Sequence, residues 1–241
     1  MQALVLAGGK GTRLRPYTMV FPKPMLPVDG RPIIDIIINQ LSNFGFDDVT
    51  ISLGYLGKYI EMYFEDKSNI PPGMTIRYFT ESRPLGTSGP VALLDDPDEN
   101  FLVINGDILS SINYSNFFAF HTEQNAVLSM AVGIREVKMS LGVLEFGNDH
   151  RIKSFVEKPT YTYHDNMGIY VYNRKALSYI EKDKKTDLND LVSRLLEKEE
   201  KVCGFLSGDP YYWIDIGQHA DYEKANIEFE KRKEEFLGNR K

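Results

Sequence analysis

Short apolar runs alternate with longer amphipathic stretches through the first half of the chain, and this alternation constrains the fold most. The runs at residues 3–7, 49–53, 75–79 and 101–105 have the length and composition of strands. The stretches at residues 33–44, 55–64 and 114–123 have apolar residues at helical spacing. This pattern predicts an α/β fold with a Rossmann-like, mostly parallel sheet flanked by helices.

The second half of the chain adds strands that follow one another closely. Residues 142–146 and 151–156 flank Gly147, Asn148 and Asp149, which predicts a hairpin. Other strands are expected at residues 126–134, 168–172, 202–206 and 211–216. Helices are expected at residues 188–199, with Asp187 as the cap, and at residues 220–237. We therefore expect a mixed sheet with a small additional β region.

The composition argues against several classes of protein. The 241 residues include 28 Lys and Arg against 34 Asp and Glu, and the net charge of −6 argues against a nucleic-acid partner. No run approaches 18 apolar residues, so we expect no membrane span. Cys203 is the one cysteine and cannot form an internal disulfide, and residues 2–7 lack the basic region of a secretory signal. A cytoplasmic protein is expected.

The first predicted strand leads into a glycine-rich loop with the sequence Leu-Ala-Gly-Gly-Lys-Gly-Thr-Arg-Leu at residues 6–14. Glycines let successive backbone N–H groups approach a bulky anion, and Arg13 adds a planar group suited to phosphate oxygens. Leu14 stands where the dinucleotide-binding fingerprint needs a third glycine, which disfavours an NAD(P)-dependent oxidoreductase, and the Walker A pattern is absent. We expect a phosphate-binding loop, and the alternative is a structural turn.

A lysine follows this loop within ten residues. Pro22 and Pro24 flank Lys23 and restrict the backbone on both sides of it. A lysine held in this way can meet a phosphate as a point charge with little entropy lost on binding. Its nearness to the glycine-rich loop favours a role there.

These segments, with several later ones in the same order, resemble the signatures of the sugar-1-phosphate nucleotidyltransferases. The later segments are Leu85 to Pro90, Asn105-Gly106-Asp107, Glu157-Lys158-Pro159, Asn166-x-Gly168 and Trp213 to Gly217. The resemblance covers about residues 1–225, and Ser88 stands where alanine is usual. The stretch from Tyr212 to Tyr222 is most similar to the mannose-1-phosphate (or heptose-1-phosphate) guanylyltransferase branch. Such enzymes serve nucleotide-sugar and polysaccharide biosynthesis.

The resemblance implies a reaction and assigns roles to residues. An oxygen of a sugar 1-phosphate attacks the α-phosphorus of a nucleoside triphosphate (NTP) and expels pyrophosphate, with Mg²⁺ as cofactor. The metal ligands would be Asp107 and Asp215, which match the family's two metal positions; Asp107 follows a predicted strand and a glycine, and Asp215 lies at the end of a late predicted strand. The catalytic residues would be Arg13, Lys23 and Asp107. The implied nucleotide-binding residues are Leu6, Ala7, Gly8, Gly9, Gly11, Thr12, Arg13, Lys23, Glu81, Gly86, Thr87, Asn105 and Gly106. The implied sugar-phosphate residues are Gly142, Glu157, Lys158, Asn166, Gly168 and Trp213.

The identity of the base depends on Glu81. The uridylyl and thymidylyl members of the family typically have glutamine at this offset from Gly86. A carboxylate only accepts hydrogen bonds, and guanine is the base that presents two adjacent donors, so Glu81 favours GTP. In the alternative interpretation the side chain of Glu81 points to solvent.

Two other functions stay open at this stage. The first alternative to a guanylyltransferase is a uridylyl- or thymidylyltransferase of the same family. The second is a non-catalytic regulatory subunit that binds a sugar nucleotide. We expect one nucleotidyltransferase domain over residues 1–241. Residues 1–135 would mainly bind nucleotide, residues 136–219 would mainly bind the sugar, and residues 220–241 would form a C-terminal helix. The resemblance also makes a homo-oligomer plausible.

Overall fold

A computed structural model of the chain describes residues 1–238 and places a seven-stranded sheet at the centre. The strands are β1 (Gln2–Ala7), β4 (Asp48–Leu53), β5 (Thr75–Thr80), β6 (Asn100–Asn105), β8 (Leu128–Lys138), β11 (Thr160–Asn173) and β12 (Val202–Phe205). They lie in the order β12-β8-β11-β6-β1-β4-β5, and β11 is antiparallel to both neighbours while the other pairs are parallel. This confirms the predicted mostly parallel α/β sheet.

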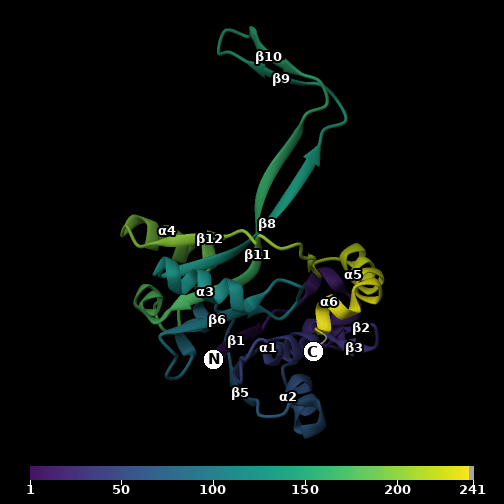
Figure 1. The fold of residues 1–241 in the computed structure, drawn as a ribbon, viewed down its shortest axis with the longest axis vertical. Coiled ribbons are helices and arrows are strands. Elements are labelled where there is room, and N and C mark those ends of the chain that lie inside the picture. The colour runs from purple at the N-terminus through teal and green to yellow at the C-terminus, as the bar shows by residue number, and fades with distance from the viewer. Residues whose placement is uncertain (239–241) are drawn as a thin grey trace.

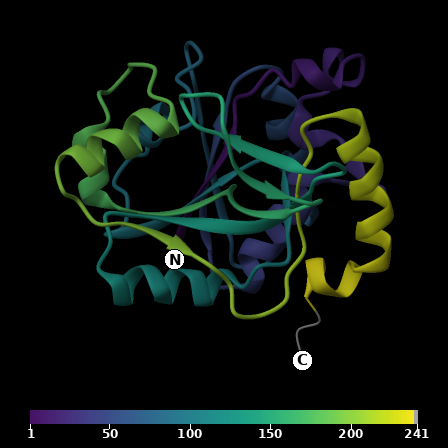
Figure 2. The same ribbon diagram turned by 90° about the horizontal axis from the view of Figure 1, so that it is seen from above.

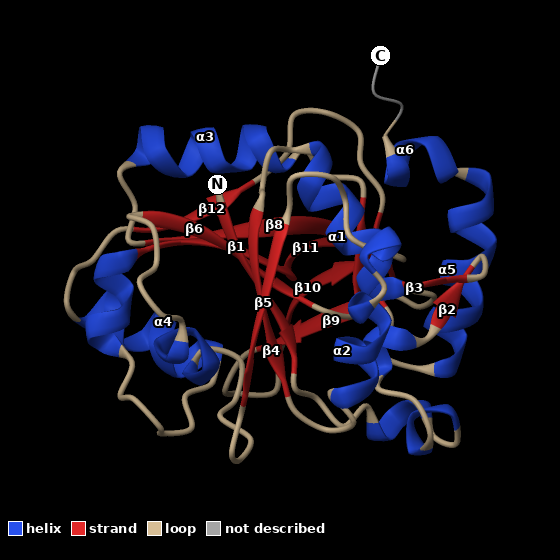
Figure 3. Cartoon of the chain, turned by 90° about the horizontal axis from the view of Figure 1, so that it is seen from below, coloured by secondary structure: helices blue, strands red, loops and turns tan. Residues whose placement is uncertain are grey.

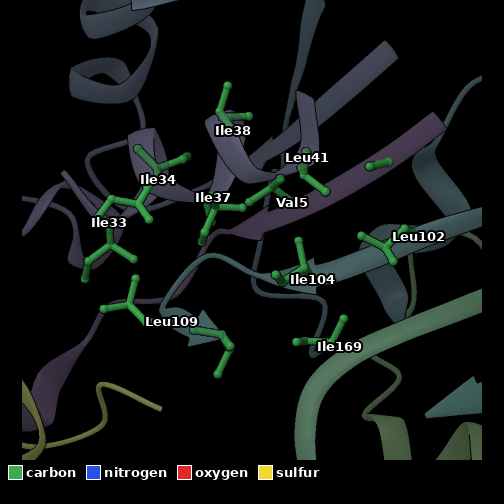
Figure 4. Packing of buried hydrophobic residues seen from close by; sticks show 14 of the residues in the cluster. Val5, Ile33, Ile34, Ile37, Ile38, Leu41, Leu102, Ile104, Leu109 and Ile169 are labelled. Carbon is green, nitrogen blue, oxygen red and sulfur yellow. The ribbon is translucent and has the colours of Figure 1, made fainter. Parts of the chain in front are cut away.

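Helices cover both faces of the sheet (Figures 2 and 3). They are α1 (Ile33–Asn43), α2 (Lys58–Glu65), α3 (Tyr114–Gln124), α4 (Leu188–Glu197), α5 (His219–Lys231) and α6 (Lys233–Leu237). Alternate residues of a strand point to opposite faces, so Val5 joins the core under α1 and Leu4 joins the core under α4. Figure 4 shows the first of these cores, where Ile34, Ile37 and Leu41 of α1 lie over β1 and β6.

Several 3₁₀ turns shape the loops around the sheet. They are η1 (Thr12–Leu14), η2 (Tyr17–Met19), η3 (Lys23–Met25), η4 (Lys67–Asn69), η5 (Gly89–Leu93) and η6 (Arg174–Tyr179). Helix α2 begins three residues later than predicted, because Leu56 has a positive φ of 56° and residues 55–57 form a turn. No helix within residues 1–238 is long and apolar enough to cross a membrane.

Four short strands form two pairs outside the central sheet. Strand β2 (Pro27–Val28) pairs with β3 (Arg31–Pro32), and β7 (Ile108–Ser110) pairs with β13 (Trp213–Asp215). In the second pair Asp215 lies opposite Ile108, and the N–H of Ile216 donates to the carbonyl of Asp107 at 3.1 Å. This pairing brings together two carboxylates that are more than a hundred residues apart in the sequence.

The predicted hairpin is confirmed as β9 (Val143–Phe146) and β10 (Ile152–Val156). Strand β8 ends four residues later than predicted, and β11 begins eight residues earlier than predicted. Strand β11 begins at Thr160 and pairs with β8 as far as Lys138. We call residues 134–164 the arm, because Figure 1 shows them extending away from the layered body. The additional β region is therefore a projecting ribbon.

The prediction of one continuous C-terminal helix over residues 220–237 is wrong. The helix is interrupted at Arg232, between α5 and α6. Arg232 binds Glu228 and Glu235 and lies 5.1 Å above the ring of Tyr212. The break lets Phe236 stack on a ring of α5 in the core. Residues 239–241 of the predicted C-terminal part lie outside the described residues.

Candidate active site

A cavity of about 310 Å³ opens where strands β1 and β6 end. Parallel strands end at one edge of the sheet, and ligands bind there in open α/β folds. Eleven of the residues expected at the site line it, namely Leu6, Ala7, Gly8, Gly9, Lys23, Glu81, Gly86, Thr87, Asn105, Gly106 and Asp107. Pro24, Pro84, Leu85 and Pro90 complete the described lining, and sequence reasoning assigned them no role.

The glycine-rich loop and Glu81 meet in the wall of this cavity. A Cβ at Gly8 would overlap the Oε1 atom of Glu81, so any other residue at this position would displace this carboxylate. Oε1 accepts a hydrogen bond from the hydroxyl of Ser52 at 2.9 Å, and Oε2 accepts one from the backbone N–H of Leu85 at 3.0 Å. Each carboxylate oxygen can accept two hydrogen bonds, so both keep capacity for a ligand.

Ser52 is one residue at this site that sequence reasoning missed. It is fully buried on β4, next to the first strand, and its hydroxyl fixes the carboxylate of Glu81. A serine among the apolar residues of a buried strand is the signal that could have found it, because a buried hydroxyl needs a partner.

Lys23 lies between the two predicted metal ligands. Its ammonium pairs with Asp107 Oδ2 and lies 3.7 Å from Asp215 Oδ1. The lysine is 8% exposed, and the flanking prolines hold it in the 3₁₀ turn η3. Two carboxylates therefore converge on one position that a cation already fills.

Charges of both signs lie close together around the ammonium of Lys23. Partial desolvation and the neighbouring carboxylate of Asp107 raise the pKa of Asp215 above its ordinary value, although Lys23 and Arg13 lower it. Like charges in a partly desolvated cleft favour a cation. The hard oxygen ligands of Asp107 and Asp215 fit Mg²⁺, which uses few protein ligands together with waters and phosphates. Within residues 1–238 no three His, Cys, Asp or Glu side chains are grouped to hold a metal by themselves.

Gly11, Thr12 and Arg13 are expected nucleotide-binding residues that lie beside the cavity and do not line it. They form the start of η1, and Arg13 is exposed. A Cβ at Gly217 would lie 3.5 Å from Nη1 of Arg13, so the guanidinium lies over the loop that follows Asp215. Arg13 thus lies on the same side of the cleft as the two aspartates.

Asn166, Gly168 and Trp213 lie where the arm leaves the body. Gly168 has a φ of 76°, and a Cβ there would lie 2.8 Å from Nδ2 of Asn105, so the strand bends closely against the cavity wall. Oδ1 of Asn105 is buried without a hydrogen-bond donor among the described residues. The indole N–H of Trp213 donates to the carbonyl of Met167 at 2.8 Å.

A tyrosine that sequence reasoning did not single out lies at the same place. The hydroxyl of Tyr170 accepts a hydrogen bond from Nδ2 of Asn166 at 2.9 Å. Burial raises the pKa of Tyr170 to about 12, and the nearby charges of Asp107 and Asp215 add to this effect. A buried hydroxyl therefore holds the amide of Asn166 at the base of the arm.

Gly142, Glu157 and Lys158 lie on the arm, apart from the cavity of their own chain. Glu157 and Lys158 are 61% and 59% exposed at the side chain, and their charged atoms are 3.8 Å apart. A Cβ at Gly142 would lie 3.0 Å from Oε2 of Glu157, so these residues are close to one another. The structure therefore groups them but does not bring them to the nucleotide side of the cleft.

Two histidines outside the cleft lie in contrasting surroundings. His121 is buried, and its ring nitrogens lie 2.9 Å from Ser129 Oγ and 3.1 Å from Asn100 Oδ1. Burial lowers the pKa of His121 to about 4, so the ring is neutral in the fold near pH 7. His150 is exposed at the turn of the arm.

Comparison with known proteins agrees with this geometry. The family model "Nucleotidyl transferase" matches residues 2–232, so the chain belongs to the nucleotidyltransferase family. More narrowly, the relatives and the fold place it among the sugar-1-phosphate nucleotidyltransferases.

The curated relatives include more than one base specificity. A D-glycero-alpha-D-manno-heptose 1-phosphate guanylyltransferase of Aneurinibacillus thermoaerophilus is 34% identical, over 95% of this chain and 99% of that protein. A mannose-1-phosphate guanylyltransferase of Mycobacterium tuberculosis is 30% identical over 95% of this chain. A UTP–glucose-1-phosphate uridylyltransferase of Synechocystis is also 30% identical, over 93% of this chain. The chain spans 64% and 62% of the lengths of these last two relatives.

A solved structure supports the fold over nearly the whole chain. HddC from Yersinia pseudotuberculosis aligns with a TM-score of 0.71 and 27% identity, over 95% of this chain and 99% of that chain. The same protein has been solved as a complex with GMP-PN, which aligns with a TM-score of 0.69 at 28% identity.

Proposed function

We propose that the chain is a sugar-1-phosphate guanylyltransferase. It transfers GMP from GTP to a sugar 1-phosphate, with mannose 1-phosphate or heptose 1-phosphate favoured. The observation that carries the proposal is one cleft that combines a glycine-rich loop, a lysine held between two carboxylates, and the carboxylate of Glu81 in the cavity wall. We also propose that it acts in the cytoplasm, where its triphosphate substrate is made.

The proposed reaction forms one bond and breaks another at the α-phosphorus. An oxygen of the sugar 1-phosphate bonds to this phosphorus, and the bond to the bridging oxygen of the β-phosphate breaks, so the electron pair leaves with pyrophosphate. Such a transfer needs positioning and charge neutralisation more than covalent chemistry from the protein. Backbone N–H groups of the glycine-rich loop would hold the triphosphate, and Arg13 and Lys23 would balance its growing charge.

Asp107 and Asp215 would hold Mg²⁺ when it is bound. The ion would supply positive charge that stabilises the negative charge developing on the phosphates. Lys23 pairs with Asp107 and lies near Asp215, so its ammonium offsets part of the negative charge of the two carboxylates and is placed to meet a phosphate when the nucleotide binds.

The proposed preference for a guanine base rests on the hydrogen-bond chemistry of Glu81. Its carboxylate is fixed by Ser52 and Leu85, and both of its oxygens can still accept the ring N–H and amino group of guanine. Uracil and thymine would place a carbonyl oxygen against a carboxylate, which is repulsive. A same-family uridylyl- or thymidylyltransferase is the second candidate, and the 30%-identical UTP-dependent relative favours keeping it.

The test is pyrophosphate release measured across four nucleoside triphosphates and three sugar 1-phosphates (mannose, heptose and glucose) with Mg²⁺. We expect GTP to give the highest kcat/KM with each acceptor that reacts. Equal or faster turnover with UTP or dTTP would contradict the guanine assignment. Binding of a sugar nucleotide without any pyrophosphate release would support a regulatory subunit instead.

A further inference from the structure

Strands β7 and β13 hold Asp107 and Asp215 together through a ladder of only three residues on each strand. A pair of strands this short is marginal in water unless another layer packs on it. The two carboxylates also carry the same charge and repel each other, and the ammonium of Lys23 offsets this repulsion only in part. The strand pair therefore needs support from elements outside the ladder.

Helix α1 supports strand β7 through the side chain of Gln40. Its amide nitrogen donates one hydrogen bond to the carbonyl of Ser110, the last residue of β7, at 2.8 Å, and one to the carbonyl of Phe236 in α6 at 2.7 Å. The hydroxyl of Tyr114 lies 3.5 Å from Oε1 of the same amide, so the amide nitrogen faces the two carbonyls. Gln40 is 3% exposed and Ser110 and Phe236 are 1% exposed, so each carbonyl would be left buried without this donor if the amide were removed.

Helix α6 connects the same amide to strand β13. The ring of Phe236 meets the ring of Tyr212 edge to face, with 5.8 Å between the ring centroids. Tyr212 directly precedes β13, and its N–H donates to Oγ of Ser111 at 2.8 Å while its carbonyl accepts the N–H of Ser111 at 2.9 Å. Asn43 of α1 donates to the carbonyl of Leu237 at 2.6 Å, which holds α6 against α1 a second time. Helices α1 and α6 and the two strands thus form one connected set of contacts.

These contacts reach both carboxylates from the same distance along the chain. Ser110 comes three residues after Asp107, and Tyr212 comes three residues before Asp215. The N–H of Ile216, directly after Asp215, donates to the carbonyl of Asp107 at 3.1 Å and closes the ladder beside the two side chains. A shift of β7 against β13 would therefore change the separation of the two carboxylate groups.

We propose that Gln40 is a positioning residue that sets the separation of Asp107 and Asp215 by joining β7 to α6. Through α6 and Tyr212 the same amide acts on β13, so one buried side chain holds both strands that carry the carboxylates. Groups that orient metal ligands typically change metal affinity by about 10- to 100-fold when they are altered. The effect on a bound cation rests on the proposed function, whereas the support of the strand pair does not.

The test compares two buried glutamines. Gln40→Met keeps the length of the side chain and removes both donors. The matched control is Gln2→Met, because Gln2 is also 3% exposed and its side chain also bonds to the backbone, where it accepts the N–H of Asp98 at 2.9 Å. Gln2 begins β1, at the opposite end of this strand from the cavity. Both variants therefore lose a buried hydrogen bond, and only one loses the contact with β7.

The first measurement is the hydrogen exchange of the Ile216 amide, followed by nuclear magnetic resonance. The rate is divided by that of Val5 in the centre of the main sheet, which corrects for opening of the whole fold. We expect Gln40→Met to raise this ratio at least about tenfold and Gln2→Met to leave it within about twofold, because only the first change loosens the strand pair. An unchanged ratio in Gln40→Met overturns the proposal.

The second measurement is the affinity for Mn²⁺ by electron paramagnetic resonance, with a GTP analogue that cannot be cleaved between the α- and β-phosphates. We expect Gln40→Met to weaken Mn²⁺ binding by about tenfold and Gln2→Met to leave it unchanged. Phe236→Leu is the second variant, should the first not fold, because it keeps an apolar core and removes the ring that contacts Tyr212. It should change the exchange ratio and the Mn²⁺ affinity in the same direction.

The outcomes separate this inference from the proposed function. Faster exchange of Ile216 with an unchanged Mn²⁺ affinity overturns the positioning role of Gln40. If the wild type binds no Mn²⁺ while Gln40→Met still speeds the exchange, the proposed metal site fails and the support of the strand pair stands.

Discussion

The body and the arm of this molecule are built from strands of the same sheet but differ in what surrounds them. In the body, β1 and β6 lie between helices, and Val5, Leu102 and Ile104 are fully buried. In the arm, β8 and β11 continue past the helices, and Ile134 and Tyr163 are 60% and 50% exposed. The same hydrogen-bonded ladder therefore passes from a packed core into an uncovered ribbon (Figure 1).

This difference separates two kinds of functional residue. The groups that would hold the nucleotide are fixed by the body, because Glu81 and Lys23 each have partners from other elements. Glu157 and Lys158 lie on the arm, where their charged atoms are 3.8 Å apart and both side chains are exposed. The body therefore preorganises the nucleotide-side groups, whereas these two residues take their position from the arm.

The largest expected effect comes from the carboxylate pair of the body. We expect Asp107→Asn to lower kcat by about 10³-fold. The change removes one of the two carboxylate charges that would hold Mg²⁺ beside the reacting phosphates. The melting temperature should change by only a few degrees. Retention of Mg²⁺-dependent pyrophosphate release in this variant would refute the role of Asp107.

A matched pair of substitutions measures the difference in packing directly. Ile104→Ala in β6 should lower the free energy of unfolding by about 3 kcal/mol, because it leaves a cavity in a closed core. Ile152→Ala on the arm should lower it by less than about 0.5 kcal/mol, because Ile152 is 60% exposed and leaves no cavity. Urea unfolding of both variants gives the comparison. Equal losses would show that the arm packs on its own body.

The buried histidine of the body gives a dependence on pH. His121 is neutral in both states above its ordinary pKa of 6.5, and below it the unfolded chain takes a proton that the folded chain refuses until about pH 4. The free energy of unfolding should therefore fall between pH 6.5 and 4, by at most about 3 kcal/mol from this group. His121→Asn should remove this part of the decline. The control His150→Asn, at the exposed turn of the arm, should leave it in place.

The smallest expected effect concerns the choice of base. Glu81→Gln should reduce the preference for GTP over UTP by about tenfold, because an amide replaces an acceptor by a donor opposite the base. The ratio of kcat/KM values for the two nucleotides is the measurement. An unchanged ratio would mean that Glu81 only positions the loop through Ser52 and Leu85.

The sequence predicts the body better than the arm for a physical reason. Residues that follow parallel strands meet at one edge of the sheet, so the order of the strands and the residues after them already group Gly8, Glu81 and Asp107. The pairing of β7 with β13 links distant segments by only three residues each, and no local pattern indicates it. The sequence does not predict the full length of β11, because the residues of its outer half are exposed. They are polar or aromatic and do not show the apolar pattern of a buried strand.

The central claim is that Asp107 and Asp215 hold one divalent cation together with the nucleotide. Mn²⁺ can be followed by electron paramagnetic resonance, in the presence of a GTP analogue that cannot be cleaved between the α- and β-phosphates. The account predicts that the wild type removes one equivalent of Mn²⁺ from solution and that both Asp107→Asn and Asp215→Asn weaken this binding strongly. If either variant binds Mn²⁺ and the analogue as tightly as the wild type, the two carboxylates do not share a cation and the account is contradicted.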